Sequence, residues 1–223
     1  MFLKKSFAIA ILAVMTVCAS AQDFKKFRFG PTVGLNLASN SAKEVKPKVG
    51  FSIGALGEYN FTNNFYMTSA LKFSLKSSKF ENEKKGTHGS YEPYYIEIPI
   101  HGGYRYSFND KFSVFGEFGP YFGIGVFGKA YENNVLMKKE TVAGIYPETE
   151  YEFRDITMDY FGDFKNHSVL GANRFDFGLG LAAGVEYSNF QARLGYDLGL
   201  TKIFDVEGSA RNRNFYIAVS YMF

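Results

Sequence analysis

Histidine and cysteine, the side chains that most often carry catalysis or bind metals, are scarce in this chain of 223 residues, which has three histidines and one cysteine. The histidines are His88, His101 and His167. His101 follows Glu97 by four residues, which is about 13 Å on an extended strand, so the two do not form a ready-made pair. His167 lies near Asp163 and suggests a His–Asp dyad, although a solvated loop histidine is the simpler interpretation. Without a metal-binding spacing, we expect no enzyme, no catalytic residue, no cofactor and no metal.

Charged side chains form a second regular group. Six cations and six anions recur at alternate positions of extended segments, opposite the apolar residues. They are Arg28, Glu58, Lys72, Lys76, Glu97, Arg105, Glu117, Arg174, Asp176, Glu186, Arg193 and Asp197. If this face points into a closed interior, each unpaired charge is costly. The equal numbers predict a network of paired charges inside the fold.

Eight segments with period-2 alternation carry these charges. They cover residues 28–38, 49–61, 65–76, 94–106, 112–126, 174–187, 190–200 and 214–223. Alternation is the signature of a strand with two different faces. Most of these segments are about 10–13 residues long, well above the ~5–6 of soluble strands and close to the 9–11 of a tilted transmembrane strand. The segments therefore favour strands that cross a membrane.

The connections between these segments alternate in length. The short ones are 62–64, 107–111 and 188–189, and the longer ones are 39–48, 77–93, 128–173 and 202–212. Barrels of bacterial outer membranes have short periplasmic turns, longer outside loops and an even number of strands. The sequence thus predicts an all-β fold: an eight-stranded antiparallel up-and-down transmembrane β-barrel over 22–223, with a long third extracellular loop at about 128–173.

Aromatic residues adjoin every short connection. They are Tyr59, Phe61, Phe65, Tyr104, Tyr106, Phe112, Tyr187, Phe190, Tyr221 and Phe223. Because aromatic rings favour the bilayer interface, these residues are expected to form a periplasmic aromatic girdle. The alternative is a soluble eight-stranded ligand-binding barrel, in which the apolar face would point inward. The long strands and the glycine-rich polar face oppose this alternative.

The third long connection, about 128–173, far exceeds the ~12–15 residues of ordinary loops. It is rich in both aromatic and acidic residues. Within it, 153–164 is expected to form either a short amphipathic helix or an extension of the strand 174–187. Two roles remain open for the connection: a surface for a protein partner or for cations bound to lipopolysaccharide, and a lid packed on the barrel mouth.

Residues 1–21 have the pattern of a secretory signal peptide. A positive start precedes an apolar stretch at 7–17, and Ala19-Ser20-Ala21 provides an A-x-A cleavage site. Val17 stands where a lipoprotein signal needs a small residue before Cys18, which disfavours lipid attachment. The formal charge of +3 is too small to suggest nucleic acid as a partner. We expect an exported protein of the cell outer membrane.

Several strand motifs resemble the PorT-like outer-membrane β-barrel family of Bacteroidota. They are Gly34-Leu35-Asn36, Tyr95–Ile100, Arg174–Gly180 and the terminal Tyr216–Phe223. The resemblance covers nearly the whole chain after the signal peptide and implies location in the outer membrane. The named member of that family is linked to type IX protein secretion and gliding. No catalytic residue can be carried over from the family.

These observations together predict a non-enzymatic structural or interaction protein with a closed, charge-paired lumen. An accessory subunit of the type IX secretion and gliding machinery is an alternative, and a small adhesin or surface-stability protein is another. The expected partners are outer-membrane lipids and lipopolysaccharide, a protein bound at 128–173, and the outer-membrane assembly machinery. That machinery would read the alternating aromatic C-terminus, which ends in Phe223.

Overall fold

The computed structural model describes residues 26–42, 45–82, 87–141, 148–161, 169–204 and 210–223. The predicted signal peptide and its cleavage site lie outside the described residues, as do Asp163 and His167. Within the described ranges, no helix is both long and apolar enough to span a membrane.

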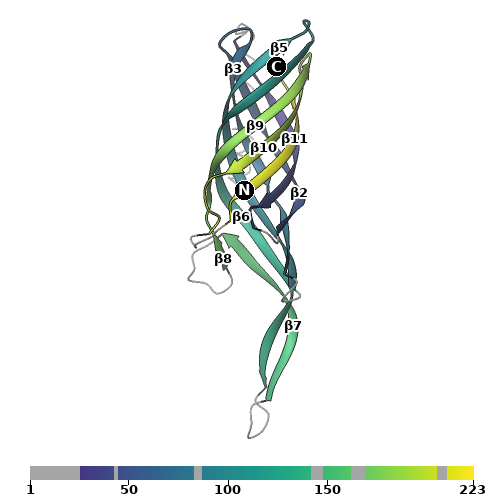
Figure 1. The fold of residues 1–223 in the computed structure, drawn as a ribbon, viewed down its shortest axis with the longest axis vertical. Helices are drawn as coiled ribbons and strands as arrows, with labels where there is room; N and C mark the ends of the chain where they lie inside the picture. The colour runs from purple at the N-terminus through teal and green to yellow at the C-terminus, as the bar shows by residue number, and fades with distance from the viewer. Residues whose placement is uncertain (1–25, 43–44, 83–86, 142–147, 162–168, 205–209) are drawn as a thin grey trace, which may run out of the picture.

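Strands make up almost all of the described chain. They are β1 (Phe27–Asn40), β2 (Val45–Asn60), β3 (Phe65–Leu75), β4 (Ser78–Asn82), β5 (Thr87–Ser107), β6 (Phe112–Thr141), β7 (Glu148–Phe161), β8 (Val169–Ala172), β9 (Phe175–Tyr187), β10 (Phe190–Gly199) and β11 (Asn212–Tyr221). Eight of them pair antiparallel in the order β1-β2-β3-β5-β6-β9-β10-β11, and β11 pairs back to β1 (Figure 1). This closed ring confirms the predicted eight-stranded barrel.

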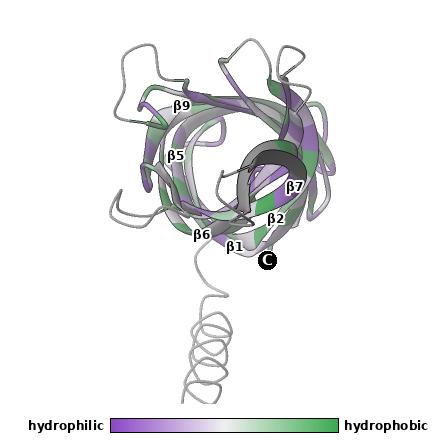
Figure 2. Cartoon of the chain, turned by 90° about the horizontal axis from the view of Figure 1, so that it is seen from below, coloured by the Kyte–Doolittle hydropathy of each residue, from purple (hydrophilic) through white to green (hydrophobic). Residues whose placement is uncertain are grey.

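The barrel wall is polar on the inside and apolar on the outside. On β10, Gln191, Arg193 and Asp197 are buried, whereas Leu194 and Tyr196 between them are exposed. The other barrel strands alternate in the same way, and Figure 2 looks along the ring that they form. Because a soluble ligand-binding barrel would bury its apolar face, that alternative is wrong.

Tight turns join strand pairs at one end of the barrel. Tyr187 pairs directly with Phe190, so Ser188 and Asn189 form a two-residue turn, in which Ser188 has a φ of 55°. In the turn before β6, the Asn109 side-chain oxygen accepts hydrogen bonds from the backbone N–H groups of Lys111 and Phe112, both at 2.9 Å. The predicted short connections are therefore confirmed. The predicted longer length is wrong for the first of the other connections, because β1 and β2 extend past the predicted segments and leave only residues 41–44 between them, as many as in the turns 61–64 and 108–111.

The third long connection is built mainly from strands. β6 is 30 residues long, continues beyond the barrel and pairs antiparallel with β7, from Lys129 opposite Asp159 to Thr141 opposite Glu148. β8 then pairs with the end of β7 in parallel. The expectation of a helix, or of an extension of β9, is wrong for 153–161. The alternating sequence suits a strand, and the extended edge of β6 satisfies its backbone hydrogen bonds.

Inward aromatic rings lie directly against glycines of neighbouring strands. Tyr66 on β3 faces Gly103 on β5, and Tyr216 on β11 faces Gly195 on β10. A Cβ atom added to either glycine would overlap the ring opposite it. These glycines therefore let large rings fill the narrow interior, a use of cross-strand aromatic packing found in curved sheets.

Two adjacent glycines of β5 test this packing. Gly103→Ala is expected to lower the free energy of unfolding by about 1–3 kcal/mol, the usual cost of overpacking, because its Cβ would displace the Tyr66 ring. Gly102 faces outward, and a Cβ atom added there would lie 4.0 Å from the Phe118 carbonyl oxygen, in ordinary van der Waals contact. Gly102→Ala should leave stability unchanged in urea titrations of the folded barrel. Equal effects of the two changes would refute this assignment of faces.

Candidate functional site

A network of four charges occupies the turn end of the lumen. Arg28 donates to Glu58 at 2.7 Å and to Glu186 at 2.6 Å, and Arg105 donates to Glu58 at 3.0 Å. Gln191 adds a hydrogen bond to Glu186 at 2.9 Å. Glu58 is only 1% exposed. Two arginines and two carboxylates from four strands thus balance one another at this end of the lumen.

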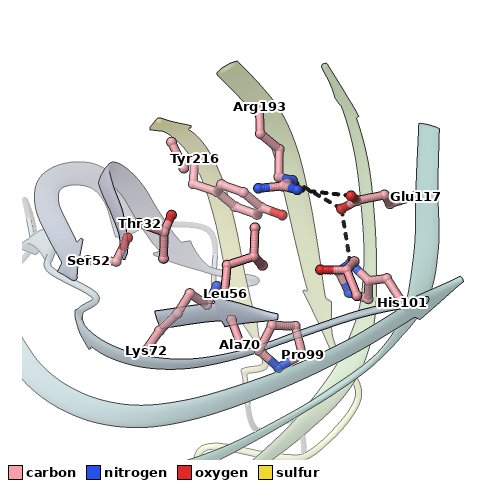
Figure 3. A pocket seen from close by; sticks show the side chains of 12 residues that line it. Thr32, Ser52, Leu56, Ala70, Lys72, Pro99, His101, Glu117, Arg193 and Tyr216 are labelled. Atoms are coloured by element: carbon pink, nitrogen blue, oxygen red, sulfur yellow. Dashed lines mark hydrogen bonds and ion pairs between the residues drawn. The ribbon is translucent and has the colours of Figure 1, made fainter. Parts of the chain in front are cut away.

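A second network lies in the middle of the lumen around Glu117. Arg193 forms a fork with the Glu117 carboxylate, through Nε at 3.0 Å and Nη2 at 2.9 Å. The Tyr66 hydroxyl donates to the same carboxylate at 2.9 Å. His101 Nδ1 lies 4.0 Å from this carboxylate (Figure 3). Such bidentate pairs fix geometry as well as charge. Arg193 also donates to Gln191 at 3.1 Å, which joins this network to the first.

A third network lies toward the end of the barrel that carries the long connections. Buried Lys76 bridges two carboxylates, Glu97 and Asp176, and its Nζ is 3.1 Å from Asp176. Lys72 Nζ lies 4.0 Å from Glu97. Asp197 accepts a hydrogen bond from Asn214 at 3.2 Å.

A cavity of about 30 Å³ lies between the middle and third networks. Its lining includes Lys72, His101, Glu117, Arg193 and Tyr216 (Figure 3). A space of this size admits about two water molecules. Large buried side chains, including Tyr95, Gln191 and Met222, pack the rest of the interior.

Arg174 is the one predicted lumen charge that the structure places elsewhere. It is exposed at the barrel rim, and its Nη1 donates to the carbonyl oxygens of Gly125 at 3.0 Å and Val126 at 2.9 Å. Its guanidinium carbon lies 5.3 Å from the centre of the Phe161 ring. The alternation was extended one residue too far, because β9 begins only at Phe175. Arg174 is at the end of the ladder: its carbonyl oxygen still accepts a hydrogen bond from the Gly125 N–H at 2.6 Å, but its side chain lies at the rim rather than in the lumen.

The histidines are not gathered into a reactive group within the described residues. His101 is buried near Glu117 rather than Glu97, and its Nε2 has no hydrogen-bond partner in the structure. His88 is exposed on the outer part of β5. Over the part of the chain that the structure describes, no cluster of His, Cys, Asp and Glu has the form of a metal site.

One motif went unnoticed in the sequence: Gly50-Phe51-Ser52-Ile53-Gly54 has the Gly-x-Ser-x-Gly spacing of serine hydrolases. That motif needs a sharp strand-to-helix turn that exposes the serine. Here the five residues lie inside β2, and Ser52 is buried on the lumen side. Figure 3 shows Ser52 beside Thr32, across the cavity from His101. The motif therefore reflects small residues on the inner face of a strand.

Beyond the lumen, an aromatic cluster packs where β7 and β8 meet the barrel. Its buried members are Tyr95, Ala130, Tyr160, Phe161, Ala172 and Ile203. Burial raises the pKa of the Tyr160 hydroxyl well above its usual value and raises the pKa of Tyr91 beside it to about 12, so both stay neutral. The third connection thus combines a packed base at the barrel with a projecting β6–β7 hairpin.

The ten predicted girdle aromatics lie at the turn end of the strands. Eight are more than 40% exposed, and Phe112 and Tyr221 are half-buried. Neighbouring rings touch edge to face, as Phe65 and Tyr104 do with centroids 5.1 Å apart. Phe108, which was not among the predicted girdle residues, is 60% exposed and lies between the rings of Tyr106 and Phe112. It lies in a turn, outside the alternating segments.

Solved structures with similar folds are outer-membrane proteins of low sequence identity. The attachment invasion locus protein Ail of Yersinia pestis, crystallised with the heparin analogue sucrose octasulfate, is 15% identical, with a TM-score of 0.43, over 89% of this chain and 99% of its own. OprG of Pseudomonas aeruginosa is 10% identical, with a TM-score of 0.43, over 89% and 95%. Neisserial surface protein A is 16% identical, with a TM-score of 0.38, over 87% and 97%. No curated protein matches the chain.

A comparison with protein families gives a more direct result. Residues 20–205 match the family described as outer membrane protein beta-barrel domain. The matched region contains seven of the eight barrel strands, from β1 to β10. Together with the closed, inside-polar barrel, this match shows that the chain belongs to the outer-membrane β-barrel protein family.

Proposed function

We propose that this protein is a non-enzymatic barrel of the outer membrane, exported by its signal peptide, whose closed lumen serves as a scaffold for a partner-binding outer surface. The observation that carries the proposal is the division of the chain into a charge-paired interior and a β6–β7 hairpin that projects beyond the barrel (Figure 1).

The ion pairs in the lumen favour a role as a scaffold over a role as an ion channel. Five of the six lumen carboxylates have at least one lysine or arginine nitrogen within 4.0 Å, as Glu58 has Arg28 and Arg105, and the sixth, Asp197, accepts a hydrogen bond from Asn214. An ion crossing the barrel would have to break such pairs in a poorly hydrated interior, where separating charges is expensive. An eight-stranded barrel offers room for side chains and little more.

The hairpin favours binding to another protein. From Val135 to Thr141, β6 pairs with β7 on one side, and β5 pairs with β6 only as far as Asn133. A two-stranded ribbon is marginally stable in water on its own, and its open edges can accept a further strand. A partner that covers the ribbon would both stabilise it and pair its open edges.

Affinity capture from intact outer-membrane complexes tests this role. The full-length barrel is expected to retain a protein partner that is lost when 134–157 is replaced by a short turn, while heat-modifiable gel mobility shows that both barrels are folded. Retention of the same partner by the shortened barrel would contradict the proposal.

The same experiment distinguishes two possible roles, that of a secretion subunit and that of an adhesin or surface-stability protein. Type IX secretion subunits, captured in fixed ratio to the barrel, would support the accessory role that the PorT-like resemblance implies. A lone partner or host surface molecule would support an adhesin or surface-stability role.

A further inference from the structure

We propose that a pocket on the outer rim of the barrel, beside Arg174 and Lys129, binds the phosphate of an anionic lipid in the outer leaflet. The inference rests on the proposed function, because it takes the β7 end of the barrel as the outward end. The pocket has a volume of about 520 Å³ and is lined by residues of β5, β6 and β7, together with Arg174.

An irregularity in the sheet shapes this pocket. The register between β5 and β6 shifts at Tyr94 and Tyr95, which pair with Phe127 and Gly125 and leave Val126 as an extra residue. Val126 and Phe127 are consequently both exposed, at 39% and 54%. The bulge changes which residues face outward, so that Lys129 follows Phe127 on the outer face. Bulges at barrel rims commonly redirect side chains in this way.

Aromatic rings form an apolar shelf below the charged part of the pocket. Tyr94 stacks on Phe127 with centroids 4.6 Å apart and on Phe73 at 5.5 Å, and Phe51 meets Tyr94 at 6.5 Å. The shelf is continuous with the apolar outer face of the barrel, which includes Ile96 and Ile124. An acyl chain could lie along this face with its headgroup at the pocket, as aromatic belts at bilayer interfaces favour.

The pocket lining carries two cations, Lys129 and Arg174, and two carboxylates, Glu92 and Asp159. Both carboxylates are already paired: Asp159 with Lys129 at 2.7 Å, and Glu92 with Lys48, which lies outside the lining. Among the described residues, Arg174 has no carboxylate partner, since its hydrogen bonds go to backbone carbonyl oxygens. The Arg174 guanidinium, whose charge no direct carboxylate contact offsets, favours an anion beside Lys129. A guanidinium matches the oxygen geometry of a phosphate particularly well.

Lipid retention tests the site. The barrel is reconstituted into phosphatidylcholine vesicles containing a minor fraction of lipid A, extracted gently and assayed for bound lipid by mass spectrometry. We expect Lys129→Gln and Arg174→Gln each to weaken lipid A retention about tenfold, which corresponds to 1.4 kcal/mol. Lys46→Gln is the matched control, because Lys46 pairs with Glu81 on the same part of the molecule but does not line the pocket.

Two further arms identify the ligand chemistry. Lipid A from which the phosphates have been removed should be retained no better by the wild type than by the variants. Inorganic phosphate should compete poorly, because it lacks the acyl chains that contact the shelf. Unchanged retention in both pocket variants would overturn the proposal, and so would efficient competition by inorganic phosphate.

Folding is monitored in parallel by heat-modifiable mobility. If Arg174→Gln impairs folding, the result with Lys129→Gln decides whether the pocket binds lipid A. Lys129 and its carboxylate partner Asp159 are both exposed, so this change is expected to leave folding intact. If instead the proposed function is wrong, thiol labelling on intact cells would place the pocket on the periplasmic side of the membrane.

Discussion

Glu58→Gln is expected to lower the free energy of unfolding of the barrel by about 3–5 kcal/mol, the typical cost of removing one partner from a buried ion pair. The change keeps the size of the side chain but removes the charge that Arg28 and Arg105 both contact. Glu186 alone would then face the half-buried Arg28 and the buried Arg105. Urea unfolding of the barrel in lipid vesicles, followed by gel mobility, measures the loss.

Glu81→Gln provides the control for this change. Glu81 makes an equally close ion pair with Lys46, and the Lys46 ammonium holds the pKa of the Glu81 carboxyl below its usual value, but both side chains are exposed. Exposed pairs contribute little to stability, so we expect no measurable change. A Glu58 variant as stable as the Glu81 variant would show that the lumen network is dispensable.

Leu181→Arg is expected to cost about 2–4 kcal/mol in the same assay, the range for an arginine on the lipid face near the bilayer midplane. Leu181 is in the middle of β9, is 61% exposed, and lies between Phe118 of β6 and Tyr196 of β10. The arginine would have to bring its charge into hydrocarbon or distort the bilayer around it.

Tyr187→Arg serves as the depth control for Leu181→Arg. Tyr187 is on the same face of the same strand and is 62% exposed, but it is the last residue of β9, beside the tight turn. Near an interface, the cost of arginine falls to about 0–1 kcal/mol. If both changes cost the same, the outer face of β9 does not cross a bilayer at the depth inferred here.

The barrel strands could be predicted because alternation directly reports which side chains share a face. Phe175, Leu179 and Leu181 are exposed and Asp176 is buried, as the sequence pattern requires. A shift of one residue would move every charge of a strand from the lumen to the lipid. The turns could be predicted equally well, since two to five residues between such strands leave room only for a tight turn.

The β6–β7 hairpin could not be predicted from the sequence in the same way. Its strand β7 pairs with a part of β6 beyond the eight predicted segments, and pairing between distant segments leaves little trace in local sequence. The position of Arg174 depended on where β9 begins, which alternation alone does not define. The bulge at Val126 was hidden because Val126 continues the alternation of the residues before it, and only the partner strand reveals the extra residue.

Thiol labelling on intact cells tests the central claim most directly, namely that the β6–β7 hairpin faces outward and the tight turns face the periplasm. Asn63 and Thr157 are both exposed, Asn63 in the turn after β2 and Thr157 on β7. With a membrane-impermeant reagent, Thr157→Cys should be labelled on intact cells and Asn63→Cys only after the outer membrane is opened. The reverse pattern, with Asn63→Cys labelled on intact cells and Thr157→Cys protected, would contradict the account.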